Sequence, residues 1–263
     1  MTGSGVLDAL GRTEVVIFGM GGVGSWCAEG LVRSGVGAVR LVDSDVVCVT
    51  NINRQVQATP ATVGRLKVEA LRDRLLEINP QCQVTAVAGV FSFETARTFG
   101  IETADYCIDA IDSITNKLDM VEYTALVGTV LFSSMGMAQK LDPTRIKIAD
   151  IWKTRGCPLA RLVRQGLRER RFSGGFTTVY SDERMPVHPE VQVSCGAPEC
   201  LCPPRNDDGN GAPVEWCGSK KVINGSAVTV TAAAGMILAS LVIRDVYDWE
   251  TAEEPFDEAA PRG

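Results

Sequence analysis

The chain has 263 residues, of which 45% are hydrophobic and 22% are charged, and its formal net charge is −6. A chain of this length and composition buries a core of its own, and its net negative charge argues against non-specific binding to nucleic acid or a membrane over the whole surface. The first residues lack the charged-then-apolar pattern of a secretion signal, so we expect a cytoplasmic protein.

A glycine-rich turn follows the first predicted strand, which is an apolar run over residues 15–18. Gly19, Gly21 and Gly24 have the G-x-G-x-x-G spacing, and a helical pattern continues over residues 25–34. Glycines allow a tight turn and a close approach of phosphate to the backbone, while the start of the helix presents free N–H groups. The pattern predicts nucleotide binding, and a tight turn that binds nothing is the alternative.

The elements that follow alternate between strands and helices. A second strand over residues 39–42 ends at Asp43, which is placed to accept hydrogen bonds from a ribose, and Thr62 is the predicted cap of a helix over residues 63–78. Later strands are predicted at 84–90, 106–111 and 129–133, with helices at 92–99 and up to about 126. This alternation predicts an α/β, Rossmann-like, mainly parallel sheet with helices on both faces.

The pattern changes after residue 134, and a C-terminal extension is predicted. It comprises an added, antiparallel strand over 145–151, a basic helix over 158–171, a long structureless connection over 173–221 and a helix over 226–247. The last helix is almost uncharged, but its alanines and threonines favour buried packing over a membrane span. We expect an ATP-binding core at 1–135, an extension at 136–250 packed as one unit with it, and a disordered tail at 251–263.

Charged and amide side chains follow the ends of the predicted strands. Asn51 and Arg54 follow the second strand, Lys67 lies one turn into the next helix, and Asp112 follows the fourth strand. Ligands of open α/β sheets bind at these strand ends. Two cations for phosphates and a carboxylate for Mg²⁺ favour a nucleoside triphosphate over the dinucleotide of a dehydrogenase. The alternative for the two cations is a pair of solvated surface charges.

Taken together, these motifs resemble the adenylating domain of the ubiquitin-activating-enzyme-like (ThiF/MoeB-type) superfamily. Six runs carry the resemblance: GMGGVGS at 19–25, DSD at 43–45, NINRQ at 51–55, VGRLK at 63–67, INP at 78–80 and DAIDS at 109–113. NINRQ, SMGMAQKLDPT at 134–144, CPLAR at 157–161 and GSA at 225–227 are similar to the branch of tRNA threonylcarbamoyladenosine dehydratases.

The resemblance implies an ATP-dependent enzyme. The threonyl carboxylate of the modified adenosine, which lies beside the anticodon, attacks the α-phosphate to form an acyl-adenylate and pyrophosphate, and an attack within the same base then closes a ring with loss of AMP. Arg54, Lys67 and Asp112 are the implied catalytic residues, with Asp112 also holding Mg²⁺. The implied nucleotide site is made of Gly19, Gly21, Gly22, Gly24, Ser25, Asp43, Asp45, Asn51, Arg54, Gln55, Lys67 and Asp112.

A tRNA substrate needs a basic surface, and residues 153–171 contain seven cations against one acid. We expect RNA contacts from Arg155, Arg161, Arg164, Arg168 and Arg171. A solvated helix face is the alternative. For the whole chain, two other functions stay open: an adenylyltransferase that activates the C-terminal Gly-Gly of a sulfur-carrier or ubiquitin-like protein, and a non-catalytic nucleotide-binding or redox-sensing module.

The predicted long connection contains four cysteines, Cys195, Cys200, Cys202 and Cys217. Four thiolates suit a structural Zn²⁺, but disulfide or redox use and unligated thiols stay open as well. The paired C-x-x-C motifs of sulfur-carrier activators are absent. The resemblance further implies a homodimer and, as another partner, a sulfur-relay protein of the cysteine-desulfurase type.

Overall fold

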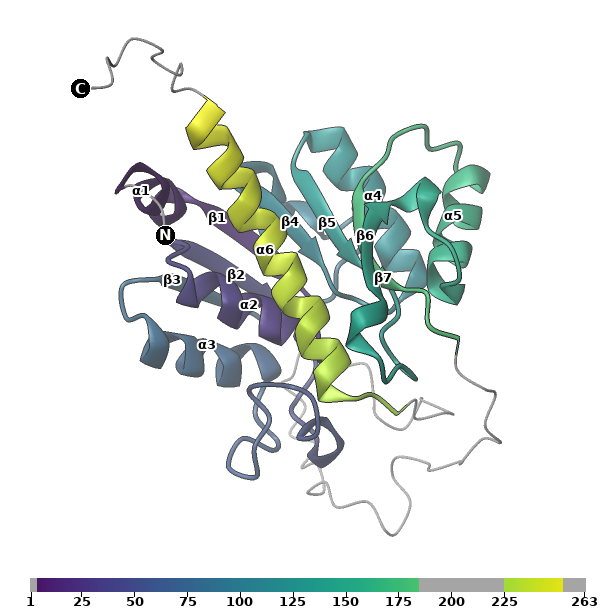
Figure 1. Cartoon of the computed structure of the whole chain (residues 1–263). Helices are drawn as coiled ribbons and strands as arrows, with labels where there is room; N and C mark the ends of the chain where they lie inside the picture. The colour runs from purple at the N-terminus through teal and green to yellow at the C-terminus, as the bar shows by residue number, and fades with distance from the viewer. Residues whose placement is uncertain (1–3, 185–224, 253–263) are drawn as a thin grey trace, which may run out of the picture.

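One sheet of seven strands forms the centre of the molecule in residues 4–184 and 225–252, which the computed structural model describes, and helices cover both of its faces (Figure 1). In chain order the elements are α1 (Ser4–Arg12), β1 (Glu14–Phe18), α2 (Gly24–Arg33), β2 (Ala38–Val42), α3 (Lys67–Ile78), β3 (Gln83–Val87), β4 (Tyr106–Asp109), α4 (Ile114–Val127), β5 (Val130–Ser134), β6 (Ile146–Asp150), α5 (Pro158–Glu169), β7 (Thr177–Ser181) and α6 (Val228–Ala252).

The strand order is β3-β2-β1-β4-β5-β7-β6, and all neighbours are parallel except β6 and β7. From β1 the chain adds β2 and β3 toward one edge of the sheet. It then returns to the other side of β1 with β4 and adds the remaining strands toward the opposite edge. Phe18 at the end of β1 pairs with Asp109 at the end of β4, so the loops that follow these strands diverge from one point. Ligands of open α/β sheets bind at such a point. The predicted fold class and the antiparallel strand near 145–151 are confirmed.

Strand β7 corrects the prediction of a structureless connection over 173–221. Residues 177–181 form a nearly buried strand that pairs in parallel with β5 and antiparallel with β6. The run has one aliphatic residue, Val179, and no clear alternation, so its position between two strands decides its conformation. Residues 185–221 lie outside the described residues.

The predicted start of α3 is also wrong. The helix begins at Lys67 rather than at residue 63, because Gly64 has a φ of +88° and Leu66 is extended. Thr62 does not cap the helix; its hydroxyl donates to the carbonyl of Gln57 (2.7 Å) in the preceding loop. The sequence pattern placed the helical period correctly but could not detect the turn that delays it.

Helix α6 lies along α2 (Figure 1), and small residues bring the two helices together. A Cβ atom on Gly30 would lie 3.0 Å from that of Ala239, and one on Gly235 would lie 2.4 Å from the carbonyl oxygen of Val23. By length and composition alone, α6 is the one helix of the described residues that could cross a membrane. Its buried face packs in the core with α1 and α2, as the sequence analysis expects.

Candidate nucleotide-binding site

The turn between β1 and α2 is packed too tightly for side chains at two of its glycines. Gly19 has a φ of +90°, and a Cβ atom there would lie 2.7 Å from the carbonyl oxygen of Ala110. A Cβ atom on Gly24 would lie 2.0 Å from the carbonyl oxygen of Gly19. The turn therefore lies directly against the end of β4, at the point where the strand order reverses.

The other two glycines differ in what lies over them. A Cβ atom on Gly22 would lie 3.1 Å from the Cβ atom of Thr231 in α6 and 3.2 Å from Cγ of Arg54. A Cβ atom on Gly21 would have no atom of another segment within 4 Å. Gly21 is therefore the place where a phosphate has room to approach the backbone.

Asp43 follows β2 and holds the turn between β1 and α2, residues 19–24, which we call the glycine turn. One carboxylate oxygen accepts a hydrogen bond from the Met20 N–H (2.6 Å), and the other accepts one from the Asp45 N–H (2.8 Å). Burial raises the pKa of Asp43, although the nearby Lys67 ammonium acts in the opposite direction. A ribose hydroxyl at Asp43, as the sequence predicts, would have to share a carboxylate that already orders the turn.

Asp45 and Lys67 form an ion pair at the start of α3. The Lys67 ammonium donates to the Asp45 carboxylate (2.6 Å), and the Lys67 N–H donates to the Asp45 carbonyl (2.9 Å). Lys67 is almost fully buried. Burial disfavours its charged form, but the carboxylates of Asp43 and Asp45 raise the pKa of Lys67 above its usual value. Lys67 is therefore charged at neutral pH.

The segment after β2 places Arg54 over the glycine turn. The Arg54 guanidinium donates to the Thr50 carbonyl and to the Asn53 side-chain oxygen, both at 2.9 Å. The Arg54 carbonyl accepts a hydrogen bond from the indole of Trp26 in α2 (3.0 Å). Both guanidinium hydrogen bonds are to neutral oxygens, so they orient the Arg54 charge without neutralising it.

Three predicted site residues, Asn51, Gln55 and Ser25, are buried, and two of them have side-chain hydrogen bonds to the backbone of the loop after β2. Asn51 accepts a hydrogen bond from the Cys48 N–H (3.0 Å), and Gln55 is buried beside it. Ser25 is fully buried, and its hydroxyl accepts a hydrogen bond from the Val56 N–H (3.3 Å). Asn51 therefore shapes the turn at residues 48–51, and Ser25 ties Val56 to α2.

Asp112 is exposed in the loop after β4, and a buried charged cluster lies beneath this loop. The Asp109 carboxylate accepts hydrogen bonds from the Lys117 ammonium (2.5 Å), the Ser133 hydroxyl (2.6 Å) and the Ile111 N–H (3.2 Å). Lys117 also donates to the Ser134 carbonyl (3.0 Å). Asp109, Lys117 and Ser133 are fully buried. The cluster fixes the ends of β4 and β5 relative to each other.

Sequence reasoning missed Lys117 and Ser133. One signal was available for Lys117, because it lies on the apolar stripe that Ile114, Leu118 and Val121 form along α4. A lysine on a buried stripe needs a carboxylate partner. Nothing in the sequence marks Ser133, because its role depends on β4 and β5 being neighbours.

Comparison with known proteins places this site in a family. The model of the ThiF family matches residues 1–253. The chain belongs to the ThiF family. It is 37% identical to the tRNA threonylcarbamoyladenosine dehydratase of Bacillus subtilis over 241 residues. The aligned residues are 91% of this chain and 89% of the relative.

A solved structure and a more distant relative extend the comparison for this ThiF-family chain. The crystal structure of Escherichia coli tRNA N6-threonylcarbamoyladenosine dehydratase in complex with ATP superimposes with a TM-score of 0.78 at 30% identity and covers 96% of this chain and 93% of that one. A molybdopterin-synthase adenylyltransferase of Salmonella typhimurium is 36% identical over 132 residues, which are 49% of this chain and 53% of the relative.

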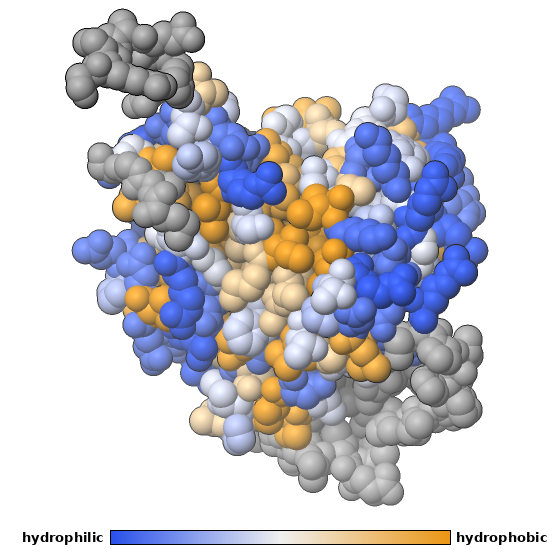
Figure 2. Space-filling view, in the orientation of Figure 1, coloured by the Kyte–Doolittle hydropathy of each residue, from blue (hydrophilic) through white to orange (hydrophobic). Residues whose placement is uncertain are grey.

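The five arginines predicted to contact RNA lie at or beside α5, away from the glycine turn, where Figure 2 shows a strongly hydrophilic surface. Arg155, Arg161, Arg168 and Arg171 are exposed, whereas Arg164 is partly buried and donates to the Thr154 hydroxyl. A neighbouring cation that the sequence analysis counted in this region, Arg170, pairs with Asp119 and Glu122 of α4 (2.6 and 2.7 Å) and so ties α5 to α4.

The predicted metal ligands are placed only in part. Cys195, Cys200, Cys202 and Cys217 lie outside the described residues. Within residues 4–184 and 225–252, no three His, Cys, Asp or Glu side chains group closely enough to hold a metal ion by themselves. Mg²⁺ often takes only one or two carboxylates and completes its shell with phosphates and waters, so the single exposed carboxylate of Asp112 fits that kind of site.

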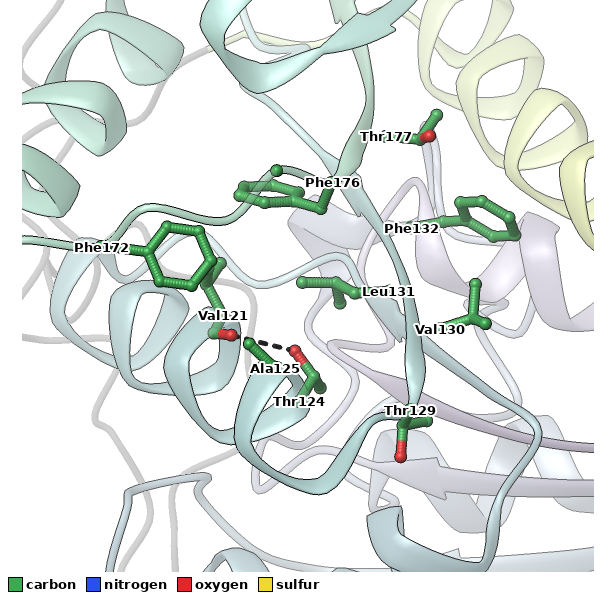
Figure 3. Close-up of a pocket in the computed structure, with 11 residues that line it drawn as sticks. Val121, Thr124, Ala125, Thr129, Val130, Leu131, Phe132, Phe172, Phe176 and Thr177 are labelled. Carbon is green, nitrogen blue, oxygen red and sulfur yellow. Dashed lines mark hydrogen bonds between the residues drawn. The ribbon is translucent and has the colours of Figure 1, made fainter.

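A cavity of about 250 Å³ lies between α4, β5 and the segment that leads into β7 (Figure 3). Its walls include the rings of Phe132, Phe172 and Phe176 together with Val130 and Thr177, which begin β5 and β7. The glycine turn follows the opposite, carboxyl end of a parallel strand. The cavity is therefore not part of the nucleotide site.

Proposed function

We propose that this ThiF-family enzyme uses ATP to dehydrate threonylcarbamoyladenosine beside the anticodon of tRNA, which closes a ring on the modified base. The observation that carries the proposal is the similarity, over nine-tenths of the chain, to dehydratases with this substrate in their name, one of them solved with ATP. The open Gly21 backbone, next to the Gly22 that Arg54 contacts, provides a matching site for a triphosphate.

The reaction needs positioning and charge stabilisation from the protein, and the site offers both. The substrate carboxylate attacks the α-phosphate, the bond to the β-phosphate oxygen breaks, and pyrophosphate leaves. A nucleophile of the same modified base then attacks the acyl carbon, and AMP leaves with the former carboxylate oxygen. Arg54 stabilises the charge of the phosphates, because both of its guanidinium hydrogen bonds given above are to neutral oxygens. Lys67 contributes less, because its charge is paired with that of Asp45.

Mg²⁺ would be held at Asp112 in this proposal. The carboxylate is exposed beyond β4, next to the glycine turn that contacts Ala110. When bound, the ion would neutralise charge on the phosphates. The cluster around Asp109 supports the loop that carries Asp112, because the Asp109 carboxylate binds both the Ile111 N–H and the Lys117 ammonium.

The proposed activity is tested by incubating the protein with ATP, Mg²⁺ and threonylcarbamoylated tRNA. Mass spectrometry of the base is expected to show the loss of one water. Arg54→Ala and Asp112→Ala are expected to reduce the rate at least 100-fold, since removing one charge stabiliser of a developing anion costs about that much. Intact ATP binding without loss of water would reject the proposal, and pyrophosphate exchange that depends on a Gly-Gly protein would favour the adenylyltransferase alternative.

The tRNA is proposed to contact the exposed arginines of α5. Arg161 and Arg168 project from the outer side of this helix, and Arg168 also lies over the ring of Trp152 at 5.6 Å. Arg161→Ala with Arg168→Ala is expected to weaken tRNA binding and to make the dependence of log K on log salt shallower by about 2, because each phosphate contact releases about one counterion. Electrophoretic mobility shifts at several salt concentrations measure this slope.

The control for the tRNA experiment is Arg72→Ala on α3, since Arg72 is a partly exposed cation on another helix, where it pairs with Asp73. An unchanged slope in the double variant, or the same change in the control, would show that α5 is only a solvated helix face. ATP affinity is expected to stay at the wild-type value in all of these variants, because none of the three arginines lies near the glycine turn.

A homodimer is also proposed, through the outer face of α6. Val228, Met236 and Tyr247 of this helix are exposed, and Figure 2 shows a largely apolar band over the middle of the helix. A second copy of the chain would cover this band. Sedimentation equilibrium that finds only monomer at micromolar concentration would reject the dimer. The structural Zn²⁺ stays a prediction, because its four cysteines lie outside the described residues, and the sulfur-relay partner stays a prediction as well.

A further inference from the structure

Both backbone polar groups of Met20, the residue between Gly19 and Gly21, are bound by side chains from other segments. The Met20 N–H donates to the Asp43 carboxylate (2.6 Å), and the Met20 carbonyl accepts a hydrogen bond from the Gln57 amide nitrogen (2.8 Å). Met20 and Gln57 are almost completely buried. The centre of the glycine turn is therefore held from both sides, and sequence reasoning identified only one of the two side chains.

The Gln57 amide has only one favourable orientation. Its nitrogen lies near two acceptors, the Met20 carbonyl and the Gln55 side-chain oxygen (3.4 Å). Turning the amide over would place its oxygen against both of them. In the observed orientation the Gln57 side-chain oxygen is buried without a hydrogen-bond partner among the described residues. A buried acceptor without a partner lowers the stability of the fold. An apolar replacement of Gln57 therefore removes this unfavourable contribution along with the donor.

The hydrogen bond to Met20 also determines where the next N–H points. In a trans peptide the carbonyl and the following N–H point to opposite sides of the chain, and the described residues contain no cis peptide. Because Gln57 binds the Met20 carbonyl on the buried side, the Gly21 N–H points to the other side. No atom lies within 4 Å of the position that a Cβ atom of Gly21 would take, so there is room for a ligand at this residue.

We propose that Gln57 is a positioning residue, which holds the peptide between Met20 and Gly21 so that the Gly21 N–H donates to a phosphate oxygen of the nucleotide. The inference deepens the proposed function and rests on it. A hydrogen bond from a backbone N–H to an ionised phosphate is stronger than one between neutral groups. Without Gln57 the peptide is free to rotate, and this donor is no longer held in place.

The test compares a nucleotide with phosphates and one without. Gln57→Leu keeps the approximate volume but has no donor, and isothermal titration calorimetry gives its Kd for ATP and for adenosine. ATP is expected to bind about tenfold more weakly than to the wild type, as for the loss of one hydrogen bond to a charged group. Adenosine, which has no phosphate, is expected to bind with the wild-type Kd.

Two further variants keep the comparison decisive. Gln57→Met keeps the length of the side chain, has no donor and is expected to weaken ATP binding to the same extent, which covers the case that Gln57→Leu does not fold. Thr124→Val removes a buried hydroxyl that donates to the carbonyl of Met120 (2.8 Å) in α4, so it is the matched control and is expected to bind both ligands like the wild type.

Equal weakening for ATP and adenosine would show that Gln57 only supports the fold of the site, and unchanged ATP binding in a folded variant would show that it has no role there. Either result overturns the inference but leaves the dehydration activity of the wild type standing. Failure of the wild-type protein to bind ATP would instead reject the proposed function, and the inference with it.

Discussion

Replacement of Lys117 by methionine is expected to lower the free energy of unfolding by about 3–5 kcal/mol, the cost of leaving a buried charge without its partner. Lys117 and Asp109 are both fully buried, and the Lys117 Nζ atom lies 2.5 Å from Oδ2 of Asp109. Methionine fills the space of the lysine stem but leaves the Asp109 carboxylate with the Ser133 hydroxyl and the Ile111 N–H alone. Urea unfolding followed by circular dichroism measures the change.

The double variant Asp109→Asn with Lys117→Met tests the physical cause of this loss. It removes both charges, and the asparagine oxygen still accepts from Ser133 or the Ile111 N–H, so we expect it to recover more than half of the lost stability. Lys147→Met is the control, because this exposed lysine pairs with Asp182 at the surface, and we expect a change below about 1 kcal/mol. A stable Lys117→Met variant would contradict a supporting role for the cluster.

Gly24→Ala is expected to weaken ATP binding and to reduce the rate of dehydration by about 100-fold or more, since a displacement of 1 Å in a site that must position its reactants costs about this much in rate. The new Cβ atom would lie 2.0 Å from the carbonyl oxygen of Gly19, and backbone cannot move aside as a flexible side chain can. The glycine turn must therefore shift. Isothermal titration calorimetry gives the change in Kd, and thermal unfolding is expected to show a lower Tm.

Gly21→Ala separates the ligand from the fold. No atom lies within 4 Å of the added methyl group, and Gly21 is not among the glycines with positive φ, so we expect the Tm to stay at or slightly above the wild-type value. ATP binding is still expected to weaken, because the methyl group occupies the space proposed for the phosphates. Wild-type ATP affinity in this variant would show that the phosphates bind elsewhere.

The order of strands and helices followed from the sequence because it depends on local physics. The apolar run at 15–18 and the valine- and leucine-rich run at 39–42 are typical of parallel strands, and Gly19 and Gly24 mark positions where the backbone has no room for a Cβ atom. The same runs indicated the region of the nucleotide site, since loops after parallel strands meet at one edge of the sheet. Ordered motifs of this kind identified the superfamily.

The tertiary structure alone decided which further side chains support that site. Strand β7 exists because β5 and β6 lie on either side of it, and the ion pair of Asp109 with Lys117 depends on α4 covering the end of β4. Gln57 contacts Met20 across 37 positions of sequence. Propensity and periodicity act over a few residues, whereas these contacts depend on how distant segments pack, so no local pattern in the chain could specify them.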